Sequence, residues 1–275
     1  MAHLRSVELR SSADLAAEWF PFSVPIIRQL PRLDLNQSVT CLVGENGSGK
    51  STLLEGLALA ANLPTVGSGE AGRDATLRAQ RDLAKVLKLV WNRMATPGFF
   101  LRAEDFFGFT KSLSAMRAEL LTRLDELEEE YKDRSAWAKG LARLPVLNSL
   151  ADMERRYGVN LDANSHGQSF LRLFQSRFVP RGLYLLDEPE APLSPQSQLG
   201  LLAMINDMVQ QDAQFVIATH SPILLGFPDA VIYSCDELPM RRVAFEDLEH
   251  VVLTRAFLND RQRFLRRLME PNPGA

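Results

Sequence analysis

The sequence contains few cysteines and no long run of apolar residues. It has 2 cysteines in 275 residues, and Cys41 and Cys235 each lie within a short apolar run. Two such cysteines are typical of reduced core thiols and not of a disulfide framework. No apolar stretch approaches the roughly eighteen residues that a membrane-spanning helix needs, and the first residues lack the pattern of a signal peptide. We therefore expect a soluble, cytoplasmic protein.

Neither sign of charge is in large excess. The net charge is −3, from 31 basic and 34 acidic residues, and 46% of the residues are hydrophobic. These ordinary values exclude a disordered chain, a collagen-like chain and a protein whose whole surface binds polyanions. Only 6 of the basic residues are lysines, and none follows Lys139. A lysine with a chemical function must therefore lie in the first half of the chain.

Short apolar runs alternate with helical patterns along the chain. Because the runs lack a period of two, they are typical of strands buried on both faces, as in a parallel sheet covered by helices. The length of 275 residues is sufficient for one large domain of this kind. We therefore predict an α/β fold with a mostly parallel sheet flanked by helices. Strands are expected at 39–44, 182–186, 214–220 and 230–235, and helices at 50–63 and 196–209.

A helical segment interrupts this alternation between the first and second strands. From Lys111 to Tyr131, apolar residues recur at intervals of three and four, which indicates an amphipathic helix. Another helix is expected around 136–156. We predict a single domain over 1–275, with a helical insertion at 104–164 and a helical tail at 236–275.

Residues 44–51, GENGSGKS, match the phosphate-binding pattern G-x-x-x-x-G-K-[ST] between an expected strand and an expected helix. The glycines allow backbone N–H groups to turn toward a phosphate, in conformations that a side chain would block. Lys50 places a point charge on the β- and γ-phosphates, and Ser51 supplies an oxygen to Mg²⁺. The expected nucleotide-binding residues are Gly44, Glu45, Asn46, Gly47, Ser48, Gly49, Lys50, Ser51 and the adjoining Thr52.

Two adjacent acids, Asp187 and Glu188, follow the apolar run at 182–186. They lie at the carboxyl end of an expected strand, where α/β sheets gather their ligands. Because adjacent side chains point in different directions, the two acids can have different functions. Asp187 would hold Mg²⁺, and Glu188 would face the attacking water. The alternative is a solvated pair of acids that caps the next helix.

His220 ends the expected strand at 214–220. A histidine in isolation is typically a hydrogen-bonded structural residue. At a strand end beside two other ligand-bearing strand ends, however, its imidazole can contact the γ-phosphate or fix the attacking water. The predicted catalytic residues are therefore Glu188, His220 and Lys50, and the predicted metal ligands are Ser51 and Asp187.

The order of these motifs resembles that of the ABC-type P-loop ATPases, in particular their SMC/RecF-like branch of small bacterial AAA-family proteins. In that class a signature, usually LSGGQ, opens a helix roughly twenty residues before the second acid motif. In this chain, residues 164–168 occupy the corresponding place, and Gln168 precedes Asp187 by 19 residues. Ser165, Gly167 and Gln168 match the signature, whereas Asn164 and His166 depart from it.

The resemblance implies ATP and Mg²⁺ as cofactors and an ATP-dependent homodimer. Ser165, Gly167 and Gln168 of one subunit would complete the γ-phosphate pocket of the other, so that two ATP molecules lie between the subunits. It further implies ATP hydrolysis by a clamp or remodeller that acts on DNA or a partner protein, in DNA maintenance or defence. The alternatives are the nucleotide-binding subunit of an ABC transporter and a switch that binds ATP without hydrolysing it.

The chain departs from the family's pattern at two further places, and one assignment stays open. Ser194 stands where the family usually has an aspartate after the acid pair. The segment 98–107 lacks the glutamine that normally touches Mg²⁺, so Arg102 or Glu104 is the expected substitute. For the aromatic residue that stacks on adenine the candidates are Trp19, Phe20 and Phe22, which core packing explains equally well.

Basic residues gather near the C-terminus. Residues 255–270 carry a net charge of +3. A solvated helix face is one interpretation, and contact with DNA phosphates is the other. The arginines concerned are Arg255, Arg261, Arg263, Arg266 and Arg267.

Overall fold

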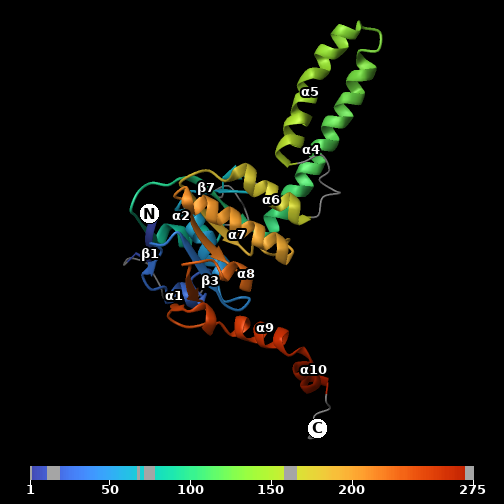
Figure 1. Ribbon diagram of the computed structural model, residues 1–275. Coiled ribbons are helices and arrows are strands. Elements are labelled where there is room, and N and C mark those ends of the chain that lie inside the picture. Colours follow the sequence, from blue (N-terminus) through green and yellow to red (C-terminus); the bar gives the residue numbers. More distant parts are fainter. Residues whose placement is uncertain (1, 11–18, 67–68, 71–77, 158–165, 270–275) are drawn as a thin grey trace.

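The computed structural model describes residues 2–10, 19–66, 69–70, 78–157 and 166–269. In this part of the chain, helices cover both faces of an eight-stranded sheet, and a three-stranded antiparallel sheet lies beside it. A helical hairpin and a C-terminal pair of helices extend from the body in different directions (Figure 1).

The eight-stranded sheet is parallel except at its edges. Its strand order is β11 (Arg241–Val243), β10 (Val231–Ser234), β3 (Val39–Val43), β9 (Gln214–Ala218), β8 (Gly182–Asp187), β7 (Thr96–Arg102), β4 (Pro64–Thr65) and β5 (Gly69–Glu70). Only the edge strands β11 and β5 pair in the antiparallel sense. The central strands β3, β8 and β9 are buried along their whole length, which explains their uninterrupted apolar sequences. The predicted fold class is confirmed.

The smaller sheet is fixed to the larger one by a buried glutamine. This sheet consists of β2 (Leu33–Asp34), β1 (Leu4–Leu9) and β6 (Leu87–Trp91). The side-chain oxygen of Gln214 accepts hydrogen bonds from the backbone N–H groups of His3, at 2.9 Å, and Leu4, at 2.7 Å. Because Gln214 opens β9, the smaller sheet is held at the amino end of the parallel strands.

Two apolar cores cover the two faces of the large sheet. The first packs α2 (Lys50–Ala60) between the large and small sheets, and the second packs α6 (His166–Arg177) and α7 (Pro195–Gln210) on the opposite face. Each fully buried large apolar side chain contributes about 1.5–3 kcal/mol to stability, so the two layers hold the strand ends in place. The shorter helices of the body are α1 (Pro25–Arg28), α3 (Gln80–Val86) and α8 (Pro222–Leu225).

The two cysteines lie in the interior of this body, as expected. Cys41 and Cys235 are buried and free. Burial raises the pKa of each thiol to about 12. Both cysteines are therefore unreactive core residues.

The helices α4 (Ala103–Glu130) and α5 (Ala136–Tyr157) form the hairpin that projects from the body (Figure 1). Leu124 and Leu127 of α4 and Leu150 of α5 are buried, and Glu128 of α4 pairs with Arg143 of α5 at 3.1 Å. The pair falls within 104–164, where we expected a helical insertion; residues 158–164 lie outside the described part.

The C-terminal segment leaves the body on the side away from the hairpin (Figure 1). It contains the 3-10 helix η3 (Phe245–Asp247), α9 (Glu249–Asn259) and α10 (Arg261–Met269). Within 236–275, where we expected a helical tail, strand β11 precedes the helices, because its residues pair with the edge strand β10. Among the described residues, no helix is long and apolar enough to cross a bilayer.

Candidate functional site

The pairing of the parallel strands places the carboxyl ends of β3, β9 and β8 next to one another, and each of these ends is followed by one of the sequence motifs. Asp187 of β8 lies opposite Ala218 of β9, and Ala218 lies opposite Leu42 of β3. The phosphate loop after β3, Glu188 after β8 and His220 after β9 therefore emerge side by side at the carboxyl edge of the sheet. The site is thus assembled by strand pairing from segments that are far apart in the sequence.

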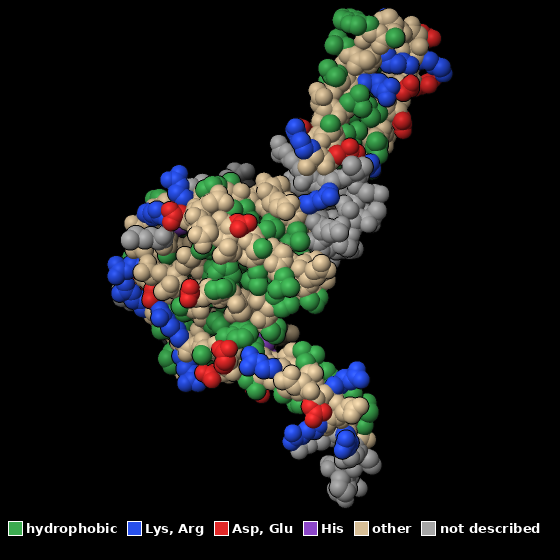
Figure 2. Space-filling model, viewed as in Figure 1, with side chains coloured by type: hydrophobic (Ala, Val, Ile, Leu, Met, Phe, Trp, Pro, Cys, Tyr) green, Lys and Arg blue, Asp and Glu red, His purple; other side chains and the backbone are tan. Residues whose placement is uncertain are grey.

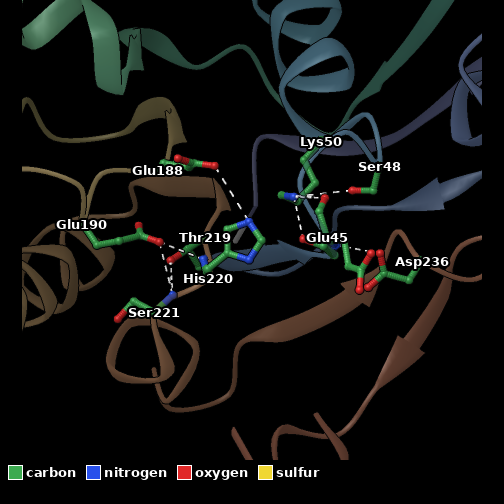
Figure 3. Close-up of polar contacts among 10 residues, drawn as sticks. Glu45, Ser48, Lys50, Glu188, Glu190, Thr219, His220, Ser221 and Asp236 are labelled. Carbon is green, nitrogen blue, oxygen red and sulfur yellow. Dashed lines mark hydrogen bonds and ion pairs between the residues drawn. The ribbon is translucent and has the colours of Figure 1, made fainter. Parts of the chain in front are cut away.

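The phosphate loop closes around the Lys50 ammonium. Lys50 is buried, and its Nζ donates hydrogen bonds to the backbone oxygens of Gly44, at 2.6 Å, and Glu45, at 2.9 Å (Figure 3). Gly47 and Gly49 have φ angles of +86° and +103°, the left-handed region that favours glycine. A Cβ on Gly49 would lie only 2.5 Å from the Val24 side chain. The loop is a glycine-dependent cradle with a positive charge at its centre, which fits a phosphate.

Asp187 and Ser51 meet beside this loop. Burial raises the pKa of the Asp187 carboxyl to about 6, although a hydrogen bond with the Ser51 side chain and the nearby Lys50 charge act in the opposite direction. Within the described chain, Oδ1 of Asp187 has no hydrogen-bond partner. A buried carboxylate oxygen beside a hydroxyl is a donor set that Mg²⁺ accepts. The described residues hold no cluster of three or more acidic, histidine or cysteine ligands, so phosphate oxygens or water would have to complete the coordination.

Glu188 and His220 face each other across the strand ends. The Oε1 atom of Glu188 lies 3.8 Å from Nε2 of His220 (Figure 3). Glu188 has a φ of +47°, a left-handed conformation that costs a non-glycine residue roughly 1–3 kcal/mol. Its backbone N–H donates to the Ala218 oxygen at 2.9 Å, which fixes this conformation. The carboxylate and the imidazole are both partly exposed, as groups that act on a solvent molecule must be.

Two cavities lie beside the phosphate loop. One, of about 400 Å³, is bordered by Lys50, Ser51 and Glu188. The other, of about 660 Å³, is bordered by the loop residues 44–48 and by His220. The predicted catalytic residues therefore all line space that adjoins the phosphate loop.

Of the three aromatic candidates for adenine stacking, Phe20 lies beside the phosphate loop. Phe20 lines the cavity that also holds Lys50 and Glu188. Phe22 is buried in the core, and the Trp19 ring contacts it edge-on at 5.0 Å between ring centroids. Core packing therefore accounts for Phe22, whereas Phe20 is free to receive a base.

Two acids that sequence reasoning did not single out hold the backbone of the site. Oε1 of Glu190 accepts hydrogen bonds from the N–H groups of His220, at 2.7 Å, and Ser221, at 3.2 Å. Oδ1 of Asp236 accepts one from the N–H of Glu45 at 2.7 Å (Figure 3). The only sequence signal for Glu190 was its place in the loop after the acid pair. Asp236 gave none, because only the pairing of β10 with β3 brings it to the phosphate loop.

The departures from the family pattern have structural explanations. The Ser194 hydroxyl caps α7 by accepting from the N–H of Ser197 at 3.2 Å. Arg102 is buried and ion-paired with Asp105 at 2.7 Å. Because a guanidinium has no lone pair for a cation, Arg102 does not replace a metal-contacting glutamine as a ligand. The Glu104 side chain lies outside the described part of the structure.

The structure describes only part of the signature. Helix α6 begins at His166, so the backbone of Gly167 and Gln168 lies in its first turn, whereas Ser165 and the side chains of 166–169 fall outside the described part. Residues 170–177 of α6, whose side chains are described, line neither cavity beside the phosphate loop. One copy of the chain brings Lys50, Ser51, Asp187, Glu188 and His220 together at this site.

Comparison with known proteins supports an ATP-binding domain. A family model described as an AAA domain matches residues 23–83. The cobalt import ATP-binding protein CbiO of Salmonella typhi is 27% identical over 221 residues, which cover 78% of this chain and 73% of that protein. The same protein of Salmonella paratyphi A matches to the same extent.

Solved structures with a similar chain course include an Smc head domain and an ABC transporter cassette. The Smc head domain of Pyrococcus furiosus, with an extended coiled coil, is 12% identical with a TM-score of 0.45, covering 95% of this chain and 100% of that chain. The ATP-binding cassette of an ABC transporter, in its ADP conformation, is 16% identical with a TM-score of 0.40, covering 87% and 91%. The family match, the curated relative and the motif order confirm the resemblance: this chain is an ATP-binding protein with the fold of the ABC-type P-loop ATPases.

Proposed function

We propose that this protein hydrolyses ATP, and that two copies join around two ATP molecules to clamp or remodel a target. The observation that carries the proposal is the placement of Glu188 and His220, 3.8 Å apart, on strand ends that flank the Lys50 loop. The loop alone would be sufficient to bind a phosphate. A carboxylate and an imidazole directed at the adjoining space add the groups that position a water for attack.

The chain's own residues fit ATP with Mg²⁺. When bound, Mg²⁺ supplies positive charge against the developing charge on the phosphate oxygens. The N–H groups of the loop and the Lys50 ammonium would bind the β- and γ-phosphates, and the carbonyl contacts of Lys50 give way to phosphate oxygens. The Ser51 hydroxyl and the unpartnered oxygen of Asp187 would hold the metal.

For the chemical step, Glu188 would orient the attacking water and accept its hydrogen bond. His220 would donate from Nε2 to the γ-phosphate or to that water. Its backbone is held by Glu190, so the imidazole is preorganised for one direction of approach.

The remaining part of the site would come from a second copy. Gly167 and Gln168 of the signature lie in the first turn of α6, and Ser165 directly precedes this helix in the sequence. Backbone N–H groups and the dipole at the start of a helix attract an anion. With two-fold symmetry each copy completes the site of the other. We infer a clamp whose target is DNA or a partner protein, in DNA maintenance or defence.

One other function has support. The relatives named as cobalt import ATP-binding proteins favour the nucleotide-binding subunit of a transporter. Such a subunit would bind a separate membrane protein. A pull-down with a hydrolysis-deficient variant in the presence of ATP discriminates, because a membrane subunit, DNA or another protein would each be retained as a different species.

The test of hydrolysis is phosphate release by the purified protein with ATP and Mg²⁺. The wild type is expected to turn over, and Glu188→Gln is expected to bind ATP without turnover. Turnover by Glu188→Gln at the wild-type rate would show that another group orients the water. ATP binding by the wild type without phosphate release would leave the third possibility, a switch driven by binding alone.

A further inference from the structure

The larger of the two cavities beside the phosphate loop has one wall that comes from the C-terminal segment. On one side this cavity, of about 660 Å³, is bordered by residues 44–48 and His220. We call it the tail cavity. The residues of the C-terminal segment that line it are Asp236, Leu238, Glu249, His250 and Leu253. The chemistry proposed above uses the loop and His220 and leaves this wall without a role.

Helix α9 turns one face to the core and another to the tail cavity. Leu248, which precedes the helix, and Val251 in its first turn are buried in the core that contains α7. His250 and Leu253 are three residues apart and so share a different face of the helix, and both line the tail cavity. Figure 2 shows that further along the C-terminal segment extends away from the body. The core packing of its neighbours therefore places His250 at the cavity wall.

The C-terminal segment is also fixed to the phosphate loop itself. The N–H of Cys235 donates to the Val43 oxygen at 2.7 Å, and Oδ1 of Asp236 accepts from the N–H of Glu45 at 2.7 Å (Figure 3). A Cβ on Gly44 would lie only 3.0 Å from both Oδ1 of Asp236 and Cβ of Cys235. The loop and the segment are thus packed together, and the two walls of the tail cavity have a fixed relation.

Two imidazole nitrogens at this cavity lack a protein partner. The Nε2 atoms of His220 and His250 are shielded from solvent, and neither has a hydrogen-bond partner in the described part of the chain. The carboxylate of Asp236 is already bonded to the loop. Three other polar residues of the cavity are exposed to solvent, namely Glu45, Asn46 and Glu249. Because a buried polar atom is costly unless it is bonded, the two histidines are the groups that a bound ligand would satisfy.

The two imidazoles lie close enough to affect each other. Burial and the nearby charge of His220 lower the pKa of His250, although Asp236 acts in the opposite direction. At neutral pH His250 is therefore an uncharged imidazole, which donates one hydrogen bond. A ligand that satisfies both Nε2 atoms as donors must carry acceptor atoms close together, as the oxygens of a terminal phosphate are.

The nucleotide would bring such a phosphate to the boundary between the two cavities. The phosphates, as proposed above, lie against Lys50 and Ser51 in the smaller cavity, which shares Asn46 and Gly47 with the tail cavity. His220 lines the tail cavity and lies 3.8 Å from Glu188 of the smaller one. The γ-phosphate ends the phosphate chain and is the part of ATP directed at His220. ADP lacks this group.

We propose that His250 is a further nucleotide-binding residue, which donates a hydrogen bond from Nε2 to a γ-phosphate oxygen beside His220. The inference rests on the proposed function, from which it takes the placement of the phosphates. It requires neither hydrolysis nor a second copy of the chain. It gives the C-terminal segment a role in the recognition of ATP over ADP.

The test compares the affinities of the full chain for ADP and for a non-hydrolysable ATP analogue, both with Mg²⁺, by isothermal titration calorimetry. His250→Ala removes the imidazole. His250→Phe keeps a ring without a hydrogen-bond donor, and it provides the same test if the alanine variant does not fold. Thr254→Ala is the matched control, because Thr254 is an exposed residue of α9 that lines neither cavity beside the phosphate loop.

We expect both His250 variants to bind the analogue about tenfold or more weakly, since a hydrogen bond to a charged oxygen is lost. Their affinity for ADP should stay within about twofold of the wild type, and Thr254→Ala should change neither affinity. Wild-type affinity of the His250 variants for the analogue overturns the proposal. An equal loss for ADP and the analogue shows that His250 only supports the loop, which also overturns it. Because the measurement is of binding, a wild type that binds ATP without hydrolysing it contradicts the proposed function and not this inference.

Discussion

The carboxylate of Glu190 holds the backbone of His220: its Oε1 accepts the His220 N–H at 2.7 Å and the Ser221 N–H at 3.2 Å. Glu190 lines neither cavity beside the phosphate loop. It therefore acts on the site through the position that it gives to His220 and through its negative charge, which helps to raise the pKa of Asp187. His220 thus lines the cavity beside the phosphate loop, whereas Glu190 holds His220 in position.

Glu190→Ala should consequently reduce turnover more than ATP binding. Losing a hydrogen bond to a charged acceptor costs about 1.5–3 kcal/mol, so we expect kcat to fall roughly tenfold or more while the dissociation constant for ATP stays within about twofold. Glu190→Gln keeps an oxygen acceptor and should recover part of the activity. Phosphate release at saturating ATP and equilibrium binding of fluorescent ATP measure the two quantities. If kcat fell as far in Glu190→Gln as in Glu190→Ala, the result would contradict a positioning role for Glu190.

Asp187→Asn should stabilise the nucleotide-free protein, and only above acidic pH. Burial raises the pKa of Asp187 from its ordinary value of 3.8 to about 6. Between these values the folded state keeps a proton that the unfolded state has lost, so this group lowers stability as pH rises through the window. The free energy of unfolding of the variant should equal that of the wild type near pH 4 and be about 2–3 kcal/mol higher above pH 6. Chemical denaturation without Mg²⁺ at both pH values, with the exposed Asp125→Asn as control, checks this; a constant difference would contradict it.

Lys50→Ala should abolish measurable ATP affinity. The ammonium is the charge at the centre of the phosphate loop, where it now contacts the oxygens of Gly44 and Glu45. Binding of fluorescent ATP should weaken by at least about a hundredfold, because a charged hydrogen-bonding partner of the phosphates is removed. The exposed Lys132→Ala provides the matched control. Unchanged affinity in Lys50→Ala would mean that nucleotide binds elsewhere.

Phe20→Ala should weaken ATP binding through the base and not through the phosphates. Phe20 lines the cavity that contains Lys50 and Glu188, and stacking of a base on an aromatic ring contributes about 1–3 kcal/mol. The affinity for ATP should therefore fall about tenfold, while the affinity for inorganic triphosphate stays the same. Trp19→Ala, which removes an exposed neighbour, should change neither. A parallel loss for both ligands would show that Phe20 supports the loop structurally.

The sequence predicted most of the fold and the centre of the site, because both depend on local patterns. The uninterrupted apolar runs of β3, β8 and β9 required a sheet covered on both faces, and the glycine spacing around Lys50 required a phosphate cradle. The roles of Glu190 and Asp236 could not be predicted, since they depend on which strands become neighbours. Arg102 was a candidate to replace the missing glutamine, but a guanidinium cannot ligate Mg²⁺, and the structure pairs it with Asp105. The exposed apolar side chains of the C-terminal helices, such as Leu258 and Leu268, could not be predicted either, because the basic pattern of 255–270 does not show which apolar side chains stay uncovered.

The central claim is that ATP joins two copies and that hydrolysis through Glu188 separates them. The measurement that tests it most directly is the mass of the Glu188→Gln protein by size-exclusion chromatography with light scattering, with and without ATP and Mg²⁺. The account predicts a dimer of Glu188→Gln with ATP and a monomer without it, and for the wild type a return to monomer once ATP is consumed. A Glu188→Gln protein that binds ATP and remains monomeric would contradict the account.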